Sequence, residues 1–183
     1  MLQPLSLPAP WDAFLEELDS ILDEPIELHC IDGFAVMAGY GFQRGTNDLD
    51  YRTLVPYSRI NDLQRLAGPG SALFEKYKVF VQHPGVEVIP DSYDERLTEI
   101  CPGRFKRIRL LIPDPYDLVL SKLSRNIERD RQDVEYLART ERLSAQTLRA
   151  RYEKEMRPNL TGDVKMHDQI LEFWIEDYFG KQN

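Results

Sequence analysis

The residues of the sequence best suited to chemistry are Asp48 and Asp50, which flank Leu49 in the segment NDLDYRTLVP. The segment is typical of a strand, and side chains alternate between the two faces of a strand, so we expect both carboxylates on one face. Two neighbouring carboxylates repel each other unless a cation lies between them, and Mg²⁺ prefers such oxygen ligands. The spacing therefore predicts a magnesium site, with a solvated polar strand end as the alternative.

Residues upstream of this pair could bind the phosphate groups of a nucleotide. The segment Ile31-Asp32-Gly33 ends the apolar run IELHCI and precedes a helix-forming stretch. A glycine turn into a helix presents free backbone N–H groups at the positive end of the helix dipole, where phosphates bind. Arg44 and Thr46 lie between this turn and the acidic pair, so they are candidates for phosphate contact and for holding the loop. Taken alone, Gly33 would fit a simple turn and Arg44 a surface charge.

Three more polar residues are candidates for the same chemistry. Lys122 and Asp133 are eleven residues apart, about three helical turns, so a roughly continuous helix would place them on one side. Asp133 could then hold Lys122 near triphosphate oxygens, although an ordinary salt bridge on a helix flank is the alternative. Glu87, in VEVIP, could complete the metal site or deprotonate an attacking hydroxyl, unless it is simply the solvent-facing residue of a strand.

The elements that would position these residues follow from hydrophobic periodicity and from turn residues. Strands are predicted at residues 26–31, 47–56, 77–82, 86–90 and 106–113, the third and fourth forming a hairpin. Helices are predicted from Trp11 to near Pro25, from about residue 33 to a closing Gly39 or Gly41, and over 57–66, 114–126, 129–140, 144–156 and 164–179. Asp114 is suited to cap the helix that begins at Pro115.

The order of these elements predicts an α+β fold with a mixed sheet flanked by helices. The chain has 183 residues, of which 42% are hydrophobic, enough for one sizeable core. We expect a single compact unit, with an α/β core over residues 1–112 and a helical C-terminal part over residues 113–183 packed on that core.

Composition also restricts location and partners. No apolar run approaches the roughly 20 residues of a membrane-spanning helix, and the N-terminal sequence lacks the features of a secretory signal, so we expect a cytoplasmic protein without a membrane partner. The formal net charge of −8 repels nucleic acid over most of the surface, so any such contact must be local. The two cysteines, Cys30 and Cys101, lack metal or redox spacing and are expected to be free and buried.

The stretch HCIDGFAVMAGYGFQRGTNDLDY resembles the minimal nucleotidyltransferases of the DNA polymerase β superfamily, close to the bacterial group related to AbiEii-type toxins. That group has a strand, a Gly-Gly or Gly-Ser turn, a helix, an Arg-x-Thr element and an Asp-x-Asp strand in this order. The later segment DPYDLVLSKLSRNIERDRQDVEYL is similar to the second signature of the group. The resemblance covers residues 28–140, and it matches Gly33 to the turn, Asp48 and Asp50 to the metal ligands, Lys122 to the helix lysine and Asp133 to the later acid.

The resemblance implies a magnesium-dependent enzyme that moves a nucleoside monophosphate from an NTP to a hydroxyl of RNA, protein or a small molecule. It also implies that the chain could be a toxin with a cognate antitoxin as partner. One residue departs from the pattern: Asp32 stands where the group usually has Gly, and its carboxylate would repel phosphates. A catalytically impaired protein that binds a nucleotide or a protein partner is therefore the second hypothesis. Hydrolase and oxidoreductase functions find no support, because the sequence has no nucleophile elbow and no Rossmann glycine motif.

Overall fold

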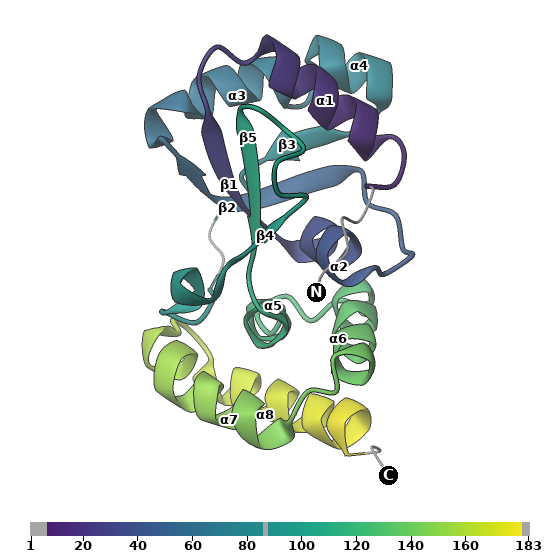
Figure 1. Ribbon diagram of the computed structural model, residues 1–183. Coiled ribbons are helices and arrows are strands. Elements are labelled where there is room, and N and C mark those ends of the chain that lie inside the picture. Colours follow the sequence, from purple (N-terminus) through teal and green to yellow (C-terminus); the bar gives the residue numbers. More distant parts are fainter. Residues whose placement is uncertain (1–6, 86–87, 181–183) are drawn as a thin grey trace. The chain divides into compact units, whose positions relative to one another are not determined.

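The computed structural model describes residues 7–85 and 88–180, which form two compact units (Figure 1). The sheet unit comprises residues 7–85 and 97–113, and the helical unit comprises residues 88–96 and 114–180. Residues 88–96 precede the division at residues 112 and 113 that was expected from the sequence, yet they group with the later helices. In the described residues, no helix has both the length and the apolar character needed to span a membrane.

The described strands form one mixed five-stranded sheet in the order β3-β2-β1-β5-β4, which confirms the predicted α+β class. Strand β1 pairs antiparallel with β2 and parallel with β5, β3 is parallel to β2, and β4 is antiparallel to β5. The bounds are β1 (Ile26–Ile31), β2 (Asp48–Val55), β3 (Phe80–Gln82), β4 (Thr98–Ile100) and β5 (Ile108–Ile112).

The helices of the sheet unit are α1 (Trp11–Ile21), α2 (Asp32–Tyr40), α3 (Ile60–Ala67) and α4 (Ala72–Tyr77). Helix α2 ends at Gly41, which has a φ of 77° and is therefore the helix-closing glycine of the two that were predicted. Gly39 lies inside α2, where an added Cβ would be 2.0 Å from Ile112 Cδ1, so its small size lets the helix pack against β5. Helix α4 was not predicted, because six residues are too few to show a helical period.

The predicted hairpin after residue 77 is wrong. Strand β3 is parallel to β2 and has Val81 fully buried, so its hydrogen bonds and its apolar side chain are both satisfied by the existing sheet. The described part of the next segment, residues 88–90, has no strand, and Pro90 lacks an N–H group for a ladder. Val86 and Glu87 lie outside the described residues. The strand beside the acidic pair is therefore β3, which ends at Gln82.

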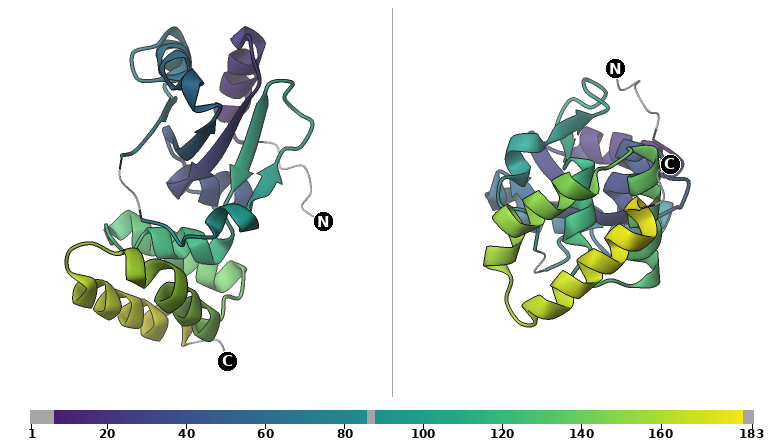
Figure 2. Two further views of the ribbon diagram at one scale, coloured as in Figure 1. Left: turned by 90° about the vertical axis from the view of Figure 1, so that its left-hand side faces the viewer. Right: turned by 90° about the horizontal axis from the view of Figure 1, so that it is seen from below.

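The helical unit contains α5 (Pro115–Ser121), α6 (Glu128–Thr140), α7 (Ala145–Arg151) and α8 (Val164–Trp174). Helices α7 and α8 are followed by single π-helical turns, Tyr152–Met156 and Ile175–Phe179, and they lie side by side in both views (Figures 1 and 2). The predicted cap is confirmed, since Asp114 accepts a hydrogen bond from the backbone N of Asp117 at 2.9 Å and Pro115 is the first helical residue.

The expectation of a roughly continuous helix from Lys122 to Asp133 is wrong. Helix α5 ends at Ser121, and α6 begins only at Glu128. Between them Asn126 has a φ of 44°, a left-handed conformation that a helix cannot contain. Lys122 is therefore the residue that ends α5, whereas Asp133 lies on the next helix.

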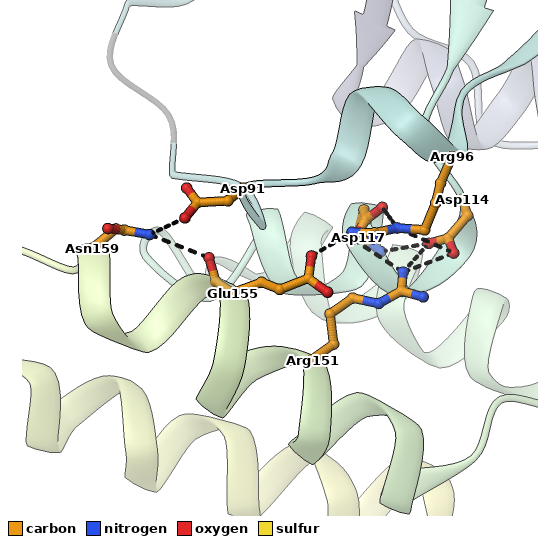
Figure 3. A network of polar contacts seen from close by, with 7 residues as sticks. All are labelled: Asp91, Arg96, Asp114, Asp117, Arg151, Glu155 and Asn159. Carbon is orange, nitrogen blue, oxygen red and sulfur yellow. Dashed lines mark hydrogen bonds and ion pairs between the residues drawn. The ribbon is translucent and has the colours of Figure 1, made fainter.

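A network of acids and arginines ties residues 91–96 to the helices of this unit (Figure 3). Arg96 binds both carboxylate oxygens of Asp117, at 2.9 and 3.0 Å, and also reaches Glu155 at 2.7 Å. Arg151 binds Asp117 from α7 at 3.0 Å and Asp114 at 2.6 Å. Burial raises the pKa of Asp117, whereas the hydrogen bonds from Arg96 oppose this shift. Each of these acids is thus matched by a guanidinium group.

Candidate functional site

The structure brings Asp48 and Asp50 together on one face of β2, as their alternation predicts. Leu49, between them, is fully buried, whereas Asp48 is half-buried and Asp50 is 6% exposed. Asp50 lies opposite Ile31 of β1 and opposite Gln82 of β3 in the sheet register. Because Ile31 is the last residue before α2, the register places Asp50 beside the turn at the start of that helix.

Gln82 links the two carboxylates. Its Nε2 donates a hydrogen bond to Asp50 Oδ1 at 2.8 Å and lies 3.4 Å from Asp48 Oδ2. One amide nitrogen therefore lies between the two acids and contacts an oxygen of each. The sequence analysis missed this residue, because its importance depends on the parallel pairing of β3 with β2, which has no local signal in the sequence.

Thr46 holds Asp48 from the loop that precedes β2. Its hydroxyl donates to Asp48 Oδ1 at 2.5 Å, and its side chain is 6% exposed. The loop itself is fixed by Trp11, whose indole Nε1 donates to the carbonyl of Thr46 at 3.1 Å. Trp11 is 1% exposed and packs edge-on against Phe34 of α2. A buried side chain on α1 therefore sets the position of the loop, and no motif in the sequence signals this anchor.

Gly33, Arg44 and Thr46 also lie together. A Cβ placed on Gly33 would be 3.5 Å from Arg44 Nη2 and 3.5 Å from Thr46 Oγ1, which is ordinary van der Waals contact. Arg44 is half-buried, and its guanidinium lies 5.6 Å from the centre of the Phe42 ring. The predicted phosphate-contact residues thus surround the first turn of α2, where backbone N–H groups have no helical acceptor.

Asp32 has the backbone conformation that explains why a glycine is usual at its position in the group that the sequence resembles. Its φ is 55°, in the left-handed region, which glycine adopts most readily and which Asp tolerates better than most residues. The residue is 8% exposed and is the first residue of α2. The tight turn between β1 and α2 is therefore formed, but with a carboxylate at its start.

Lys122 and Asp133 meet in the helical unit across the break between α5 and α6. Lys122 Nζ lies 2.8 Å from Asp133 Oδ2 and 3.7 Å from Asp130 Oδ1. The Lys122 side chain is 2% exposed and both carboxylates are fully buried. Arg125 also binds Asp130, at 2.9 Å through Nε. The pair is thus part of a buried cluster and not a solvent-exposed bridge on a helix flank.

Other candidate groups in the described residues contribute less. Glu87 lies outside those residues, and within them no group of three or more His, Cys, Asp or Glu side chains is arranged to hold a metal ion. Cys30 and Cys101 are free and buried, as predicted. Burial, followed by the charge of Asp50, raises the pKa of the Cys30 thiol, so this thiol stays protonated at neutral pH and is a poor nucleophile.

Comparison with known proteins identifies the family. The model of a family described as "Nucleotidyltransferase of unknown function (DUF6036)" matches residues 11–179 of the chain. No curated protein and no solved structure gives a significant match. Because the family model covers most of both units, the chain belongs to this nucleotidyltransferase family.

Proposed function

We propose that this member of the DUF6036 nucleotidyltransferase family moves a nucleoside monophosphate from an NTP to a hydroxyl group in a magnesium-dependent reaction. The acceptor oxygen forms a bond to the α-phosphorus, and the bond from the α-phosphorus to the oxygen shared with the β-phosphate breaks. Pyrophosphate leaves with that electron pair, and the proton of the acceptor hydroxyl passes to solvent or to a nearby carboxylate. Such a reaction depends mainly on positioning and on neutralisation of charge.

The convergence of Asp48 and Asp50 on a single amide group is the observation that carries the proposal. The two acids place oxygen atoms around one point, where only the neutral Nε2 of Gln82 is found between them. Asp48 forms no ion pair with any residue in the described ranges 7–85 and 88–180. Carboxylate oxygens in this arrangement fit Mg²⁺. When bound, the ion would neutralise phosphate charge and polarise the reacting phosphoryl group.

The first turn of α2 supports a role in triphosphate binding. Backbone N–H groups at a helix N-terminus bind anions, and Arg44 beside Gly33 supplies a positive charge there. Thr46 would act indirectly, because its hydroxyl orients Asp48. We assign Gly33 and Arg44 to the phosphates and Thr46 to positioning of the metal ligand.

The remaining site residues and partners are proposed from the resemblance described above. Lys122, held by Asp133, would bind triphosphate oxygens, and Glu87 would complete the metal site or accept the proton of the acceptor hydroxyl. The acceptor would be RNA, protein or a small molecule. A toxin role with a cognate antitoxin, as in AbiEii-type systems, is a further proposal, which co-expression with neighbouring genes would test through growth arrest and rescue.

Calorimetric titration of each of the four NTPs, with and without Mg²⁺, tests the proposal. We expect the wild-type protein to bind at least one NTP only when Mg²⁺ is present. The variant Asp48→Ala/Asp50→Ala should lose this binding, because it removes both metal ligands. Asp94→Ala/Glu95→Ala is the matched control, since it removes two exposed acids and the same charge. Equal loss in both variants would point to a general charge effect and contradict the assignment.

A catalytically impaired protein that binds a nucleotide or a protein partner is the second candidate, favoured by the buried carboxylate of Asp32 at the start of α2. The variant Asp32→Gly distinguishes the two in the same titration, because glycine retains the left-handed turn and removes the charge. If the wild-type protein binds no NTP and Asp32→Gly binds one, Asp32 has disabled the site. Binding by both proteins at similar affinity would exclude this second candidate.

A further inference from the structure

The position of the Gln82 side chain carries an inference about the metal site itself. The amide Nε2 lies within 2.8 Å of Asp50 Oδ1 and 3.4 Å of Asp48 Oδ2. It thus occupies the place between the carboxylates that the proposed Mg²⁺ would require. A cation cannot enter while the partly positive NH₂ group points at both acids, so Gln82 must change when the metal binds.

A half turn of the amide group is the smallest change that admits a cation. The oxygen and the nitrogen of a glutamine amide have nearly the same shape, and which of the two faces a neighbour is decided by the hydrogen-bond network. With two carboxylates alone, the nitrogen faces them. With a cation between them, the oxygen is the favoured atom, because Gln carbonyl oxygens are ligands for hard cations. The turn needs no backbone movement.

We infer that Gln82 is a third, neutral oxygen ligand of the metal ion proposed for Asp48 and Asp50. The inference rests on the proposed magnesium-dependent function. The described residues offer no cluster of three titratable ligands at any place, and Gln82 would supply the third oxygen without adding charge. Two carboxylates and one amide oxygen together carry a charge of −2, which balances a single divalent cation. A third carboxylate would leave a net negative charge facing the triphosphate.

Mn²⁺ binding to the nucleotide-free protein, followed by electron paramagnetic resonance, tests the inference without any assay of activity. The variant Gln82→Leu keeps the approximate shape but removes the oxygen, so we expect Mn²⁺ affinity to fall by roughly tenfold or more. The variant Gln82→Glu places a charged oxygen at the same point and should strengthen Mn²⁺ binding several-fold. Gln64→Leu is the matched control, because Gln64 donates to Tyr51 and to the Val81 carbonyl and does not contact the acids.

The outcomes separate this inference from the proposed function. Unchanged or stronger Mn²⁺ binding in Gln82→Leu, with binding lost in Asp48→Ala/Asp50→Ala, would overturn the role of Gln82 and leave the acidic site in place. Mn²⁺ binding that survives in the Asp48→Ala/Asp50→Ala variant, or that is absent from the wild-type protein, would overturn both. Circular dichroism of each variant, compared with Gln64→Leu, shows whether a lost signal reflects the ligand or the fold.

Discussion

The two units of the molecule hold their acidic side chains in different ways. In the helical unit, fully buried acids are matched by cationic side chains, as in the pairs Asp117 with Arg96 and Arg151, Asp130 with Arg125, and Asp133 with Lys122. In the sheet unit, Asp48 and Asp50 share the neutral amide of Gln82, and Asp48 also accepts from the hydroxyl of Thr46. Within the described ranges, Asp48 forms no ion pair.

This difference separates acids that stabilise the fold from acids that remain able to bind a cation. A buried ion pair has its charge neutralised within the protein, and removal of one partner leaves the other charge buried and uncompensated. Neutral hydrogen-bond donors orient a carboxylate without neutralising it. The negative charge at Asp48 therefore stays available to a metal ion, whereas the charges of Asp117 and Asp133 are already compensated.

The largest effect on stability is expected from Lys122→Met. The change removes the cation that lies 2.8 Å from the buried Asp133 carboxylate and nearly preserves the side-chain volume. The free energy of unfolding should fall by about 3 to 5 kcal/mol, the usual cost of breaking a buried ion pair. Urea unfolding followed by circular dichroism measures this change, and Lys165→Met, at an exposed position, is the control.

The double variant Lys122→Met/Asp133→Leu sharpens this test. Removing both charges should recover part of the lost stability, because no uncompensated carboxylate remains at position 133. A loss below about 1 kcal/mol in Lys122→Met would show that solvent or other groups neutralise Asp133, and the contrast between the units would then fail.

A smaller effect is expected from the partly exposed pair of Asp168 and Arg157. Hydrogen bonds from Arg157 and then from Tyr152 lower the pKa of Asp168 in the folded state. The stabilisation is therefore complete above the unfolded pKa of about 3.9 and is lost as the pH falls through the lower folded value. Asp168→Asn should reduce the free energy of unfolding by less than about 1 kcal/mol at pH 7, and the difference from wild type should shrink towards pH 2. A difference that grows on acidification would contradict this assignment.

The sequence predicts those parts of the candidate site that depend on local signals. Strand alternation places Asp48 and Asp50 on one face, and the small-residue helix with its closing glycine places Gly33 beside the loop of Arg44 and Thr46. These features need only periods of about 2 and 3.6 residues and one turn, so a short window of sequence is enough to recognise them.

The missed features depend on contacts between distant segments. Gln82 reaches the acids only because β3 pairs parallel with β2, whereas the turn residues after β3 suggest a hairpin. The anchor from Trp11 to Thr46 joins residues 35 positions apart. The break between α5 and α6 is stabilised by the Asp130 side chain, which accepts from the backbone N of Ile127 at 3.2 Å and binds Arg125. Such pairings have no sequence period, so a single sequence does not predict them.

The smallest effect on stability is expected from Asp48→Asn in the presence of a metal chelator. The Thr46 hydroxyl can still donate to the amide oxygen of Asn, and the contact with Gln82 that is disturbed is the longer one, at 3.4 Å. Asp48 is half-buried, so water can reach the new NH₂ group, and the substitution relieves the repulsion between the two carboxylates. Urea unfolding should therefore change by no more than about 0.5 kcal/mol in either direction. A loss of stability as large as that expected for Lys122→Met would mean that the Asp48 charge supports the fold, and its assignment as a free metal ligand would no longer hold.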